Sequence, residues 1–231
     1  MAFMQELKWT NDDELFRLIK EHLFSAVIGD VMDQMGLLHQ FLPAFIQPLR
    51  ADMVVAGRAM TVWHQDLTHE TRRMAAEKPF GLMLEALDDL KKNEVYLASG
   101  ASHEFALWGE LMTVRAMKLG AAGVVMNGYS RDTDGILQLG FPTFSQGRYA
   151  QDQGPRGTVL DFRIPIEIEG VKISPGDLVF GDMDGVCIIP AAREEEIVRL
   201  AWEKATGEKS VLKAIQGGMS AVEAFKTYGI M

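Results

Sequence analysis

The sequence predicts an α/β protein with helical N- and C-terminal segments. In the middle of the chain, apolar runs typical of buried strands alternate with segments of helical periodicity. Between residues 157 and 190, short alternating segments are separated by Gly, Pro and Asp, a pattern typical of strands joined by tight turns. The 231 residues, 48% of them hydrophobic, suffice for one large core, and no Pro/Gly/Ser-rich linker divides them. We therefore expect residues 1–231 to form one domain.

Two helices are expected at the N-terminal end. Residues 11–23 carry leucine and isoleucine on one helical face, and Asn11 precedes them as a candidate N-cap. The second helix is expected over residues 25–36, with Ser25 as its N-cap and Gly36 as its C-terminal stop.

The rest of the chain predicts a central α/β stretch, a β-rich stretch and two closing helices. The expected central strands are 53–66, 93–99 and 122–127, and the expected central helices are 80–92 and 108–120. The turn signals that predict successive hairpins are Glu169-Gly170, Pro175-Gly176-Asp177 and Asp184-Gly185. The closing helices are expected over residues 191–209 and 220–229.

The composition excludes several classes of function. The 23 basic and 32 acidic residues give a formal net charge of -9, which repels nucleic acid, and no dense Lys/Arg run offsets it. The N-terminus lacks the pattern of a signal peptide, and no apolar run approaches the roughly 18 residues of a membrane span. We expect a cytoplasmic protein that binds neither nucleic acid nor membrane. The single cysteine, Cys187, is interpreted as a buried strand residue.

An anion site is predicted at the start of the helix near residue 108. A turn rich in Gly and Ser precedes this helix, and the first backbone N–H groups of a helix have no partner within it. The amides in question belong to Gly109, Glu110, Leu111 and Met112.

Arginine and aspartate follow the next expected strand. Because ligands of α/β sheets bind beyond the carboxyl ends of strands, a carboxylate ligand could meet the helix amides on one side and Arg131 on the other. Asp132 could then hold a divalent cation. On spacing alone, however, an Arg-Asp pair is more often a surface pair that fixes a loop.

A calcium loop is excluded at this position. Asp132, Asp134 and Gly135 would occupy positions 3 to 6 of an EF-hand, which leaves Ser130 and Phe141 where acidic ligands belong. No phosphate-binding loop, dinucleotide fingerprint, nucleophile elbow or zinc-protease motif is present.

Two further groups of polar residues favour structural interpretations. His103 is interpreted as a loop histidine in preference to a proton shuttle or ligand. Asp30 and Asp33 lie three apart on a helix, and a solvated helix face is favoured over a metal pair.

Five segments resemble, in order, the family that includes the regulator of ribonuclease activity A and the 4-hydroxy-4-methyl-2-oxoglutarate/4-carboxy-4-hydroxy-2-oxoadipate aldolases. The segments are 25–36, 54–62, 108–132, 165–190 and 218–231. The most specific motifs are Gly-Glu-Leu at 109–111, Gly-x-x-Arg-Asp at 128–132, Pro-Gly-Asp at 175–177 and Asp-x-Asp-Gly-Val at 182–186.

The resemblance implies a fold and a set of site residues. The implied fold is a β/β/α layered sandwich like the swivelling phosphohistidine domains, assembled as a homotrimer or dimer of trimers with the active site at the subunit boundary. The implied cofactor is Mg²⁺ or Mn²⁺, bound directly by Asp132 and through water by Glu110. The amides of residues 109–112 would hold the pyruvoyl carboxylate, and Arg131 would face the keto oxygen.

The resemblance also gives the C-terminal helices a role. Residues 192–231 would pack on a neighbouring subunit, from which a carboxylate could reach metal-bound waters. Glu208 is the first candidate for this carboxylate and Glu203 the second.

The function implied is that of a metal-dependent lyase for a 2-keto acid. Retro-aldol cleavage leaves pyruvate enolate, whose developing charge a Lewis acid and a fixed arginine would stabilise. Decarboxylation of oxaloacetate passes through the same enolate, so this activity is expected too. The alternative is a non-enzymatic regulator that binds a ribonuclease. The chain departs from the family at Asn127 and at Ser99-Gly100, where many members have acidic residues, which leaves the general base and the physiological substrate open.

Overall fold

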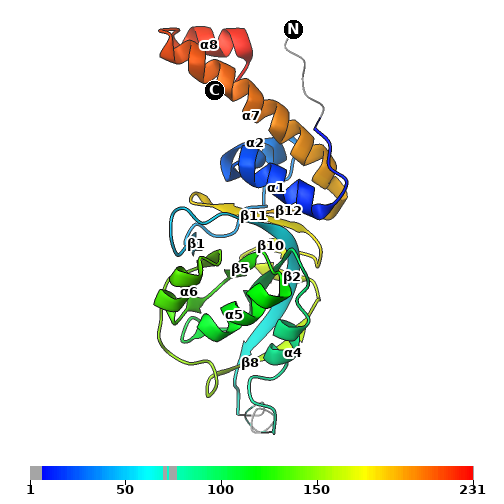
Figure 1. Cartoon of the computed structure of the whole chain (residues 1–231), viewed down its shortest axis with the longest axis vertical. Helices are drawn as coiled ribbons and strands as arrows, with labels where there is room; N and C mark the ends of the chain where they lie inside the picture. The colour runs from blue at the N-terminus through cyan, green and yellow to red at the C-terminus, as the bar shows by residue number, and fades with distance from the viewer. Residues whose placement is uncertain (1–6, 70–71, 73–76, 231) are drawn as a thin grey trace.

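The protein is a mixed α/β molecule built on one eight-stranded sheet (Figure 1). The computed structural model describes residues 7–69, 72 and 77–230. The strand order is β1-β7-β5-β3-β2-β11-β12, and β8 pairs with β2 as well. Parallel pairing joins β2, β3, β5 and β7, whereas β1, β8, β11 and β12 pair antiparallel. The strands of this sheet are β1 Gln47–Pro48, β2 Val55–Asp66, β3 Glu94–Ser99, β5 Gly123–Met126, β7 Thr143–Ser145, β8 Gly157–Phe162, β11 Leu178–Asp182 and β12 Gly185–Ile189.

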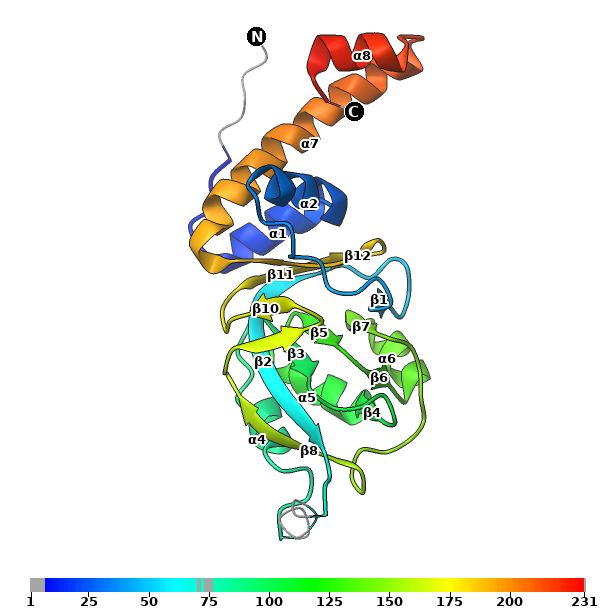
Figure 2. The same cartoon turned by 180° about the vertical axis from the view of Figure 1, so that it is seen from behind.

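Helices cover one face of the sheet and a β-hairpin covers the other (Figures 1 and 2). Along β3, Tyr96 and Ala98 pack toward the helices, whereas Val95 and Leu97 pack toward the hairpin, as the alternation of side chains along a strand requires. The helices are α4 Met83–Asp88, α5 Glu110–Leu119 and α6 Thr133–Leu139, and the hairpin is β9 Ile166–Ile168 with β10 Val171–Ile173. The predicted α/β class is confirmed, and the closer comparison with phosphohistidine domains stays a prediction.

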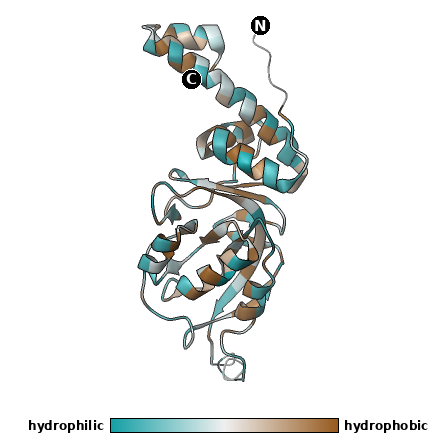
Figure 3. Cartoon of the chain, in the orientation of Figure 1, coloured by the Kyte–Doolittle hydropathy of each residue, from teal (hydrophilic) through white to brown (hydrophobic). Residues whose placement is uncertain are grey.

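A third group of helices packs on β11 and β12. It consists of α1 Asp12–His22, α2 Ser25–Gln34 and α7 Glu194–Gln216, which follows the short 3-10 helix η1 Ala191–Arg193. Figure 3 shows hydrophobic and hydrophilic residues interspersed along these helices, as amphipathic packing requires. α7 continues past the body of the protein and carries α8 Ala221–Tyr228 at its far end (Figure 1). None of the helices in the described residues is long and apolar enough to span a membrane.

The two predicted N-terminal helices are present, and Gly36, with φ of 78°, follows the end of the second as predicted, but only one of the two predicted N-caps is right. The Asn11 side chain accepts a hydrogen bond from the Glu14 N–H at 3.0 Å, so this N-cap is confirmed. Ser25 is wrong as an N-cap, because it is the first helical residue and Phe24 precedes it in the cap position. The Ser25 N–H and hydroxyl both donate to the Asp182 carboxylate at 2.7 Å, so an acceptor on β11 replaces the local one.

Two of the three predicted turns close hairpins. The turn at 169–170 joins β9 to β10, and the turn before Gly185 joins β11 to β12. The prediction of a hairpin at 175–177 is wrong, because β10 pairs with β9 and β11 pairs with β2 and β12. There the Asp177 carboxylate accepts from the Ala191 N–H at 2.9 Å, and the turn carries the chain from the hairpin layer into the main sheet. Cys187 is buried in β12, as predicted.

Two predicted helices have boundaries that differ by more than two residues from those in the structure. The helix expected over 80–92 is reduced to α4, because Phe80 and Gly81 have φ of 66° and 64° and lie outside the helical region. Hydrogen bonds to β8 hold this segment: Val159 N–H donates to the Phe80 carbonyl at 3.0 Å, and Leu82 N–H donates to the Val159 carbonyl at 2.9 Å. The helix expected over 191–209 continues as α7 to Gln216.

Candidate active site

Two short parallel strands bring two helix N-termini together. β4 Ala106–Trp108 and β6 Tyr129–Ser130 pair outside the main sheet, and each leads directly into a helix. β4 enters α5 through Gly109, and β6 enters α6 through Arg131 and Asp132. The Arg131 N–H donates to the Trp108 carbonyl at 2.9 Å, which ties the two connections. The two segments singled out from the sequence therefore lie side by side.

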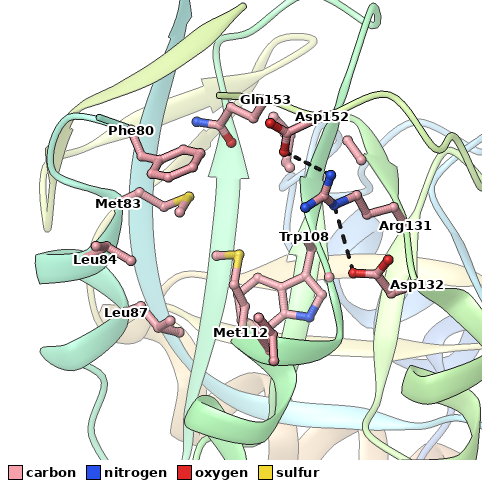
Figure 4. A pocket seen from close by; sticks show the side chains of 14 residues that line it. Phe80, Met83, Leu84, Leu87, Trp108, Met112, Arg131, Asp132, Asp152 and Gln153 are labelled. Atoms are coloured by element: carbon pink, nitrogen blue, oxygen red, sulfur yellow. Dashed lines mark ion pairs between the residues drawn. The ribbon is translucent and has the colours of Figure 1, made fainter. Parts of the chain in front are cut away.

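Arg131 lies between two carboxylates (Figure 4). Its Nη1 is 2.8 Å from Oδ1 of Asp152, and its Nε is 3.8 Å from Oδ2 of Asp132. Asp132 caps α6 with φ of 54°, a left-handed conformation that aspartate tolerates better than most residues. All three side chains are partly exposed, so the group faces a space that a ligand can enter.

Two glycines leave room for the carboxylates of Asp132 and Glu110. A Cβ at Gly109 would lie 2.6 Å from Oδ2 of Asp132, closer than side chains pack. A Cβ at Gly135 would lie 2.6 and 2.7 Å from the two carboxylate oxygens of Glu110. The Glu110 carboxylate therefore lies against the first turn of α6, on the helix that Asp132 caps.

The start of α5 offers backbone donors to an anion. Its N-cap is Gly109, which has no side chain to occupy the free N–H groups of the first turn. The Glu110 N–H faces Oδ2 of Asp132 at 3.4 Å, a long hydrogen bond. The structure thus juxtaposes three features predicted from the sequence, namely the amides at the start of α5, Arg131 and Asp132.

A pocket of about 270 Å³ opens from this group toward α4. Its polar side consists of Arg131, Asp132, Asp152 and Gln153 (Figure 4). Its other described walls are Phe80, Met83, Leu84, Leu87, Ala106, Leu107, Trp108, Gly109, Leu111 and Met112. The pocket is therefore charged at one end and apolar over most of its surface.

Sequence reasoning missed Asp152, Gln153 and the α4 wall. Asp152 and Gln153 stand in an irregular loop between β7 and β8, where no periodicity predicts the direction of a side chain. The polar run Gln-Asp-Gln at 151–153, followed by Gly-Pro, was a signal for a loop, and only the fold shows that it reaches Arg131.

Glu208 and Glu203 lie far from this pocket within one chain. Both are on α7, at the opposite side of the molecule from α5 and α6 (Figure 1). Partial burial raises the pKa of Glu208, while Lys204 nearby opposes this change. Either carboxylate could join the pocket only across a subunit boundary. No group of three or more His, Cys, Asp or Glu side chains in the described residues is arranged to hold a metal ion.

The remaining polar candidates have structural partners. Asp30 forms an ion pair with Lys204 of α7 at 2.7 Å, which agrees with the structural interpretation of that helix face. The His103 Nε2 lies 2.8 Å from the Gln146 Nε2, and the Gln146 amide donates to Asn127 at 2.7 Å. His103 and Asn127 are not among the described residues that line the pocket.

The fold defines an α/β protein with a pocket beside two helix N-termini. The chain belongs to the RraA-like family, whose Aldolase/RraA model matches residues 25–188. The family predicted from the sequence motifs is confirmed.

Two relatives and one solved structure are similar to this chain. A protein of Halalkalibacterium halodurans whose name proposes 4-hydroxy-4-methyl-2-oxoglutarate aldolase activity is 30% identical over 87% of this chain and 89% of its own length. Protein DlpA of Legionella pneumophila is 30% identical over 88% of this chain, which spans only 32% of DlpA. The crystal structure of Streptomyces coelicolor RraAS2, described as an unusual member of the RNase ES inhibitor RraA family, superposes with a TM-score of 0.74. It is 23% identical and the match covers 87% of this chain and 98% of that one, so it supports the fold alone.

Proposed function

We propose that the protein is a divalent-metal-dependent lyase that cleaves a 4-hydroxy-2-oxo acid to pyruvate and a carbonyl compound. The observation that carries this proposal is the convergence of Arg131 and Asp132 on the free amides of α5, at one end of a pocket. The aldolase name of the Halalkalibacterium halodurans relative supports the same class of reaction.

The residues present fit a magnesium or manganese ion. Mg²⁺ keeps several waters and needs only one or two carboxylates, so a dense cluster of ligands is not required. Asp132 would bind the ion directly and Glu110 through water; Gly109 and Gly135 give these two carboxylates the room to lie against the starts of α5 and α6. When bound, the ion would act as a Lewis acid toward the 2-keto oxygen.

The chain's own residues would bind and orient the pyruvoyl half. The first-turn amides of α5, including those of Leu111 and Met112, would hold its carboxylate through the helix N-terminus. The Arg131 guanidinium would face the keto oxygen and stabilise the negative charge that develops there as the C3–C4 bond breaks. Asp152 would fix the orientation of Arg131 through the 2.8 Å ion pair. Because loss of CO₂ from oxaloacetate develops the same charge, we propose oxaloacetate decarboxylation as a second activity.

We also propose that residues 1–231 form one domain that assembles as a trimer or a dimer of trimers. Leu111, at the mouth of the pocket, is 85% exposed, and α8 exposes Val222, Phe225 and Tyr228. Apolar side chains exposed in this way are typical of surfaces that another subunit covers. In such an assembly residues 192–231 pack on a neighbour, and Glu208 approaches its pocket.

The test is pyruvate release from 4-hydroxy-4-methyl-2-oxoglutarate and from oxaloacetate, with Mg²⁺ or Mn²⁺ and again with excess EDTA. We expect metal-dependent release above the metal-only background. Asp132→Ala and Arg131→Ala should each lower the rate by roughly 10²–10³-fold while the circular dichroism spectrum stays unchanged. Asp134→Ala and Arg193→Ala are the matched controls, because neither residue lines the pocket, and Arg193 pairs with Glu196 away from it. Near-normal rates in both site variants would refute the assignment.

The alternative is a protein-binding regulator of a ribonuclease. The net charge of -9 would complement a basic RNA-binding surface, and the family includes RNase inhibitors. Absence of pyruvate release from both substrates, with the oligomer intact, would favour this function, and a pull-down with a ribonuclease would then test it.

A further inference from the structure

The wall of the pocket beyond Arg131 indicates what the second half of the substrate is. Arg131 is the only cationic side chain among the described residues that line the pocket, and Asp132 and Asp152 already flank it. Within this pocket, a carboxylate on the C4 substituent of the substrate would therefore lie against an apolar wall or beside Asp152. Burial of a charge without a partner is unfavourable, so the described wall selects against 4-hydroxy-2-oxo acids that carry a second carboxylate beyond C4.

The apolar wall has the size and the composition to hold an aromatic ring. Phe80, Met83, Leu84 and Leu87 form its α4 side, and Trp108 and Met112 lie opposite (Figure 4). The pocket measures about 270 Å³, and apolar cavities of roughly 150 Å³ already bind benzene. Aromatic and thioether side chains make favourable contacts with aromatic rings, and methionine adapts to their shape.

Gln153 adds one polar group to this wall. Its side chain lies at the pocket between Phe80 and Asp152, and the residue is 4% exposed (Figure 4). Neither its Oε1 nor its Nε2 has a hydrogen-bond partner among the described residues. A buried amide without partners is costly, and at the edge of a pocket a ligand can supply them. A hydroxyl group supplies both, since it can donate to Oε1 and accept from Nε2.

We infer that the substrate is a 4-hydroxy-2-oxo monocarboxylic acid whose C4 carries a hydroxyaryl group, and that Gln153 recognises the aryl hydroxyl. The inference rests on the proposed lyase function and names the substrate class of that site. In the reaction, the C4 hydroxyl loses its proton and becomes the carbonyl of a hydroxyaryl aldehyde as the C3–C4 bond breaks. The electron pair of that bond passes to C3 and the 2-keto group, and C3 then takes up a proton to complete pyruvate.

The experiment compares kcat/KM for pyruvate release from three 4-hydroxy-2-oxo acids in the presence of Mg²⁺. Oxaloacetate is included as a fourth, smaller substrate. The three are 4-hydroxy-4-methyl-2-oxoglutarate, 4-hydroxy-4-phenyl-2-oxobutanoate and its 4-hydroxyphenyl analogue. We expect the hydroxyphenyl substrate to exceed the dicarboxylate by at least tenfold and the phenyl substrate by a smaller factor. Gln153→Leu should reduce the ratio between the hydroxyphenyl and phenyl substrates at least tenfold.

A matched variant and three outcomes make the result unambiguous. Gln151→Leu changes a glutamine of the same loop that does not line the pocket, and it should leave that ratio unaltered. If the dicarboxylate is preferred, or if Gln153→Leu keeps the ratio, the inference is overturned while the lyase function stands. If none of the four substrates releases pyruvate, the lyase function fails, and the inference fails with it.

Discussion

Replacement of Gly135 by alanine separates the stability of α6 from the position of the Glu110 carboxylate. Gly135 lies inside α6, where alanine is favoured over glycine by about 1 kcal/mol. The atoms nearest to the new methyl group belong to the Glu110 carboxylate, and this side chain is flexible and exposed and can move away. We therefore expect Gly135→Ala to raise the melting temperature by roughly 2–4 °C, given the size of the chain.

The same substitution should weaken metal binding. The alanine Cβ would occupy a position 2.6 Å from a Glu110 carboxylate oxygen, so this carboxylate must leave its place against α6. Loss of a group that holds a metal through water typically lowers affinity or activity 10–100-fold. The half-saturating Mg²⁺ concentration for pyruvate release should rise about tenfold or more, while the rate at saturating metal recovers.

Thermal unfolding and metal-activation curves, measured on the same preparations, test both expectations. Glu110→Gln should weaken the metal response without the gain in stability. Gln138→Ala, which changes another residue of α6, should leave the metal response unchanged. A more stable Gly135→Ala protein with an unaltered metal response would show that Glu110 takes no part in metal binding. A less stable protein would show that the Glu110 side chain cannot yield, contrary to its exposure.

Two other predictions concern His64 and Asp152. Burial lowers the pKa of His64 from 6.5 to about 3, and neither ring nitrogen has a partner among the described residues. The neutral histidine thus contributes full stability above pH 6.5, and this contribution is lost as the pH falls toward 3. As the pH falls from 8 to 4.5, the unfolding free energy of His64→Leu should rise relative to that of the wild type by about 2 to 3 kcal/mol, as measured by urea denaturation. A difference that does not change with pH would contradict the neutral state of His64. Asp152→Ala should raise KM for the keto acid about tenfold by freeing Arg131, with partial rescue by Asp152→Asn, and unchanged kinetics would exclude an orienting role.

Much of the sheet and both site helices were predictable because local patterns determine them. Strand β3 alternates its side chains between two covered faces, and the sequence 94–99 is apolar enough to be read as buried. Gly120 ends α5 with φ of 79°, as expected for a C-terminal glycine. The positions of the amides of residues 109–112, of Arg131 and of Asp132 were predictable because these residues lie where a strand ends and a helix begins.

The features that were missed depend on contacts between distant segments. Ser25 is a residue type typical of an N-cap, but its hydroxyl donates a hydrogen bond to Asp182, 157 residues further along the chain. Phe80 reaches the pocket because pairing with β8 forces a left-handed backbone at a position that reads as helix. Asp152 and Gln153 belong to the loop between β7 and β8, whose path depends on where these two strands lie in the sheet. The sequence could therefore not show that they line the site.

The pairing of β4 with β6 means that the site depends on strand register and not on spacing along the chain. Trp108 lies opposite Ser130, and this one pairing sets Gly109 next to Arg131 whatever the length of the chain between them. We expect insertions in the connection at 120–122 to leave this register unchanged, and we expect deletion of Gly109 to shift α5 relative to α6. Homologous chains can therefore differ in loop length around this site and still present the same arginine and carboxylates to a ligand.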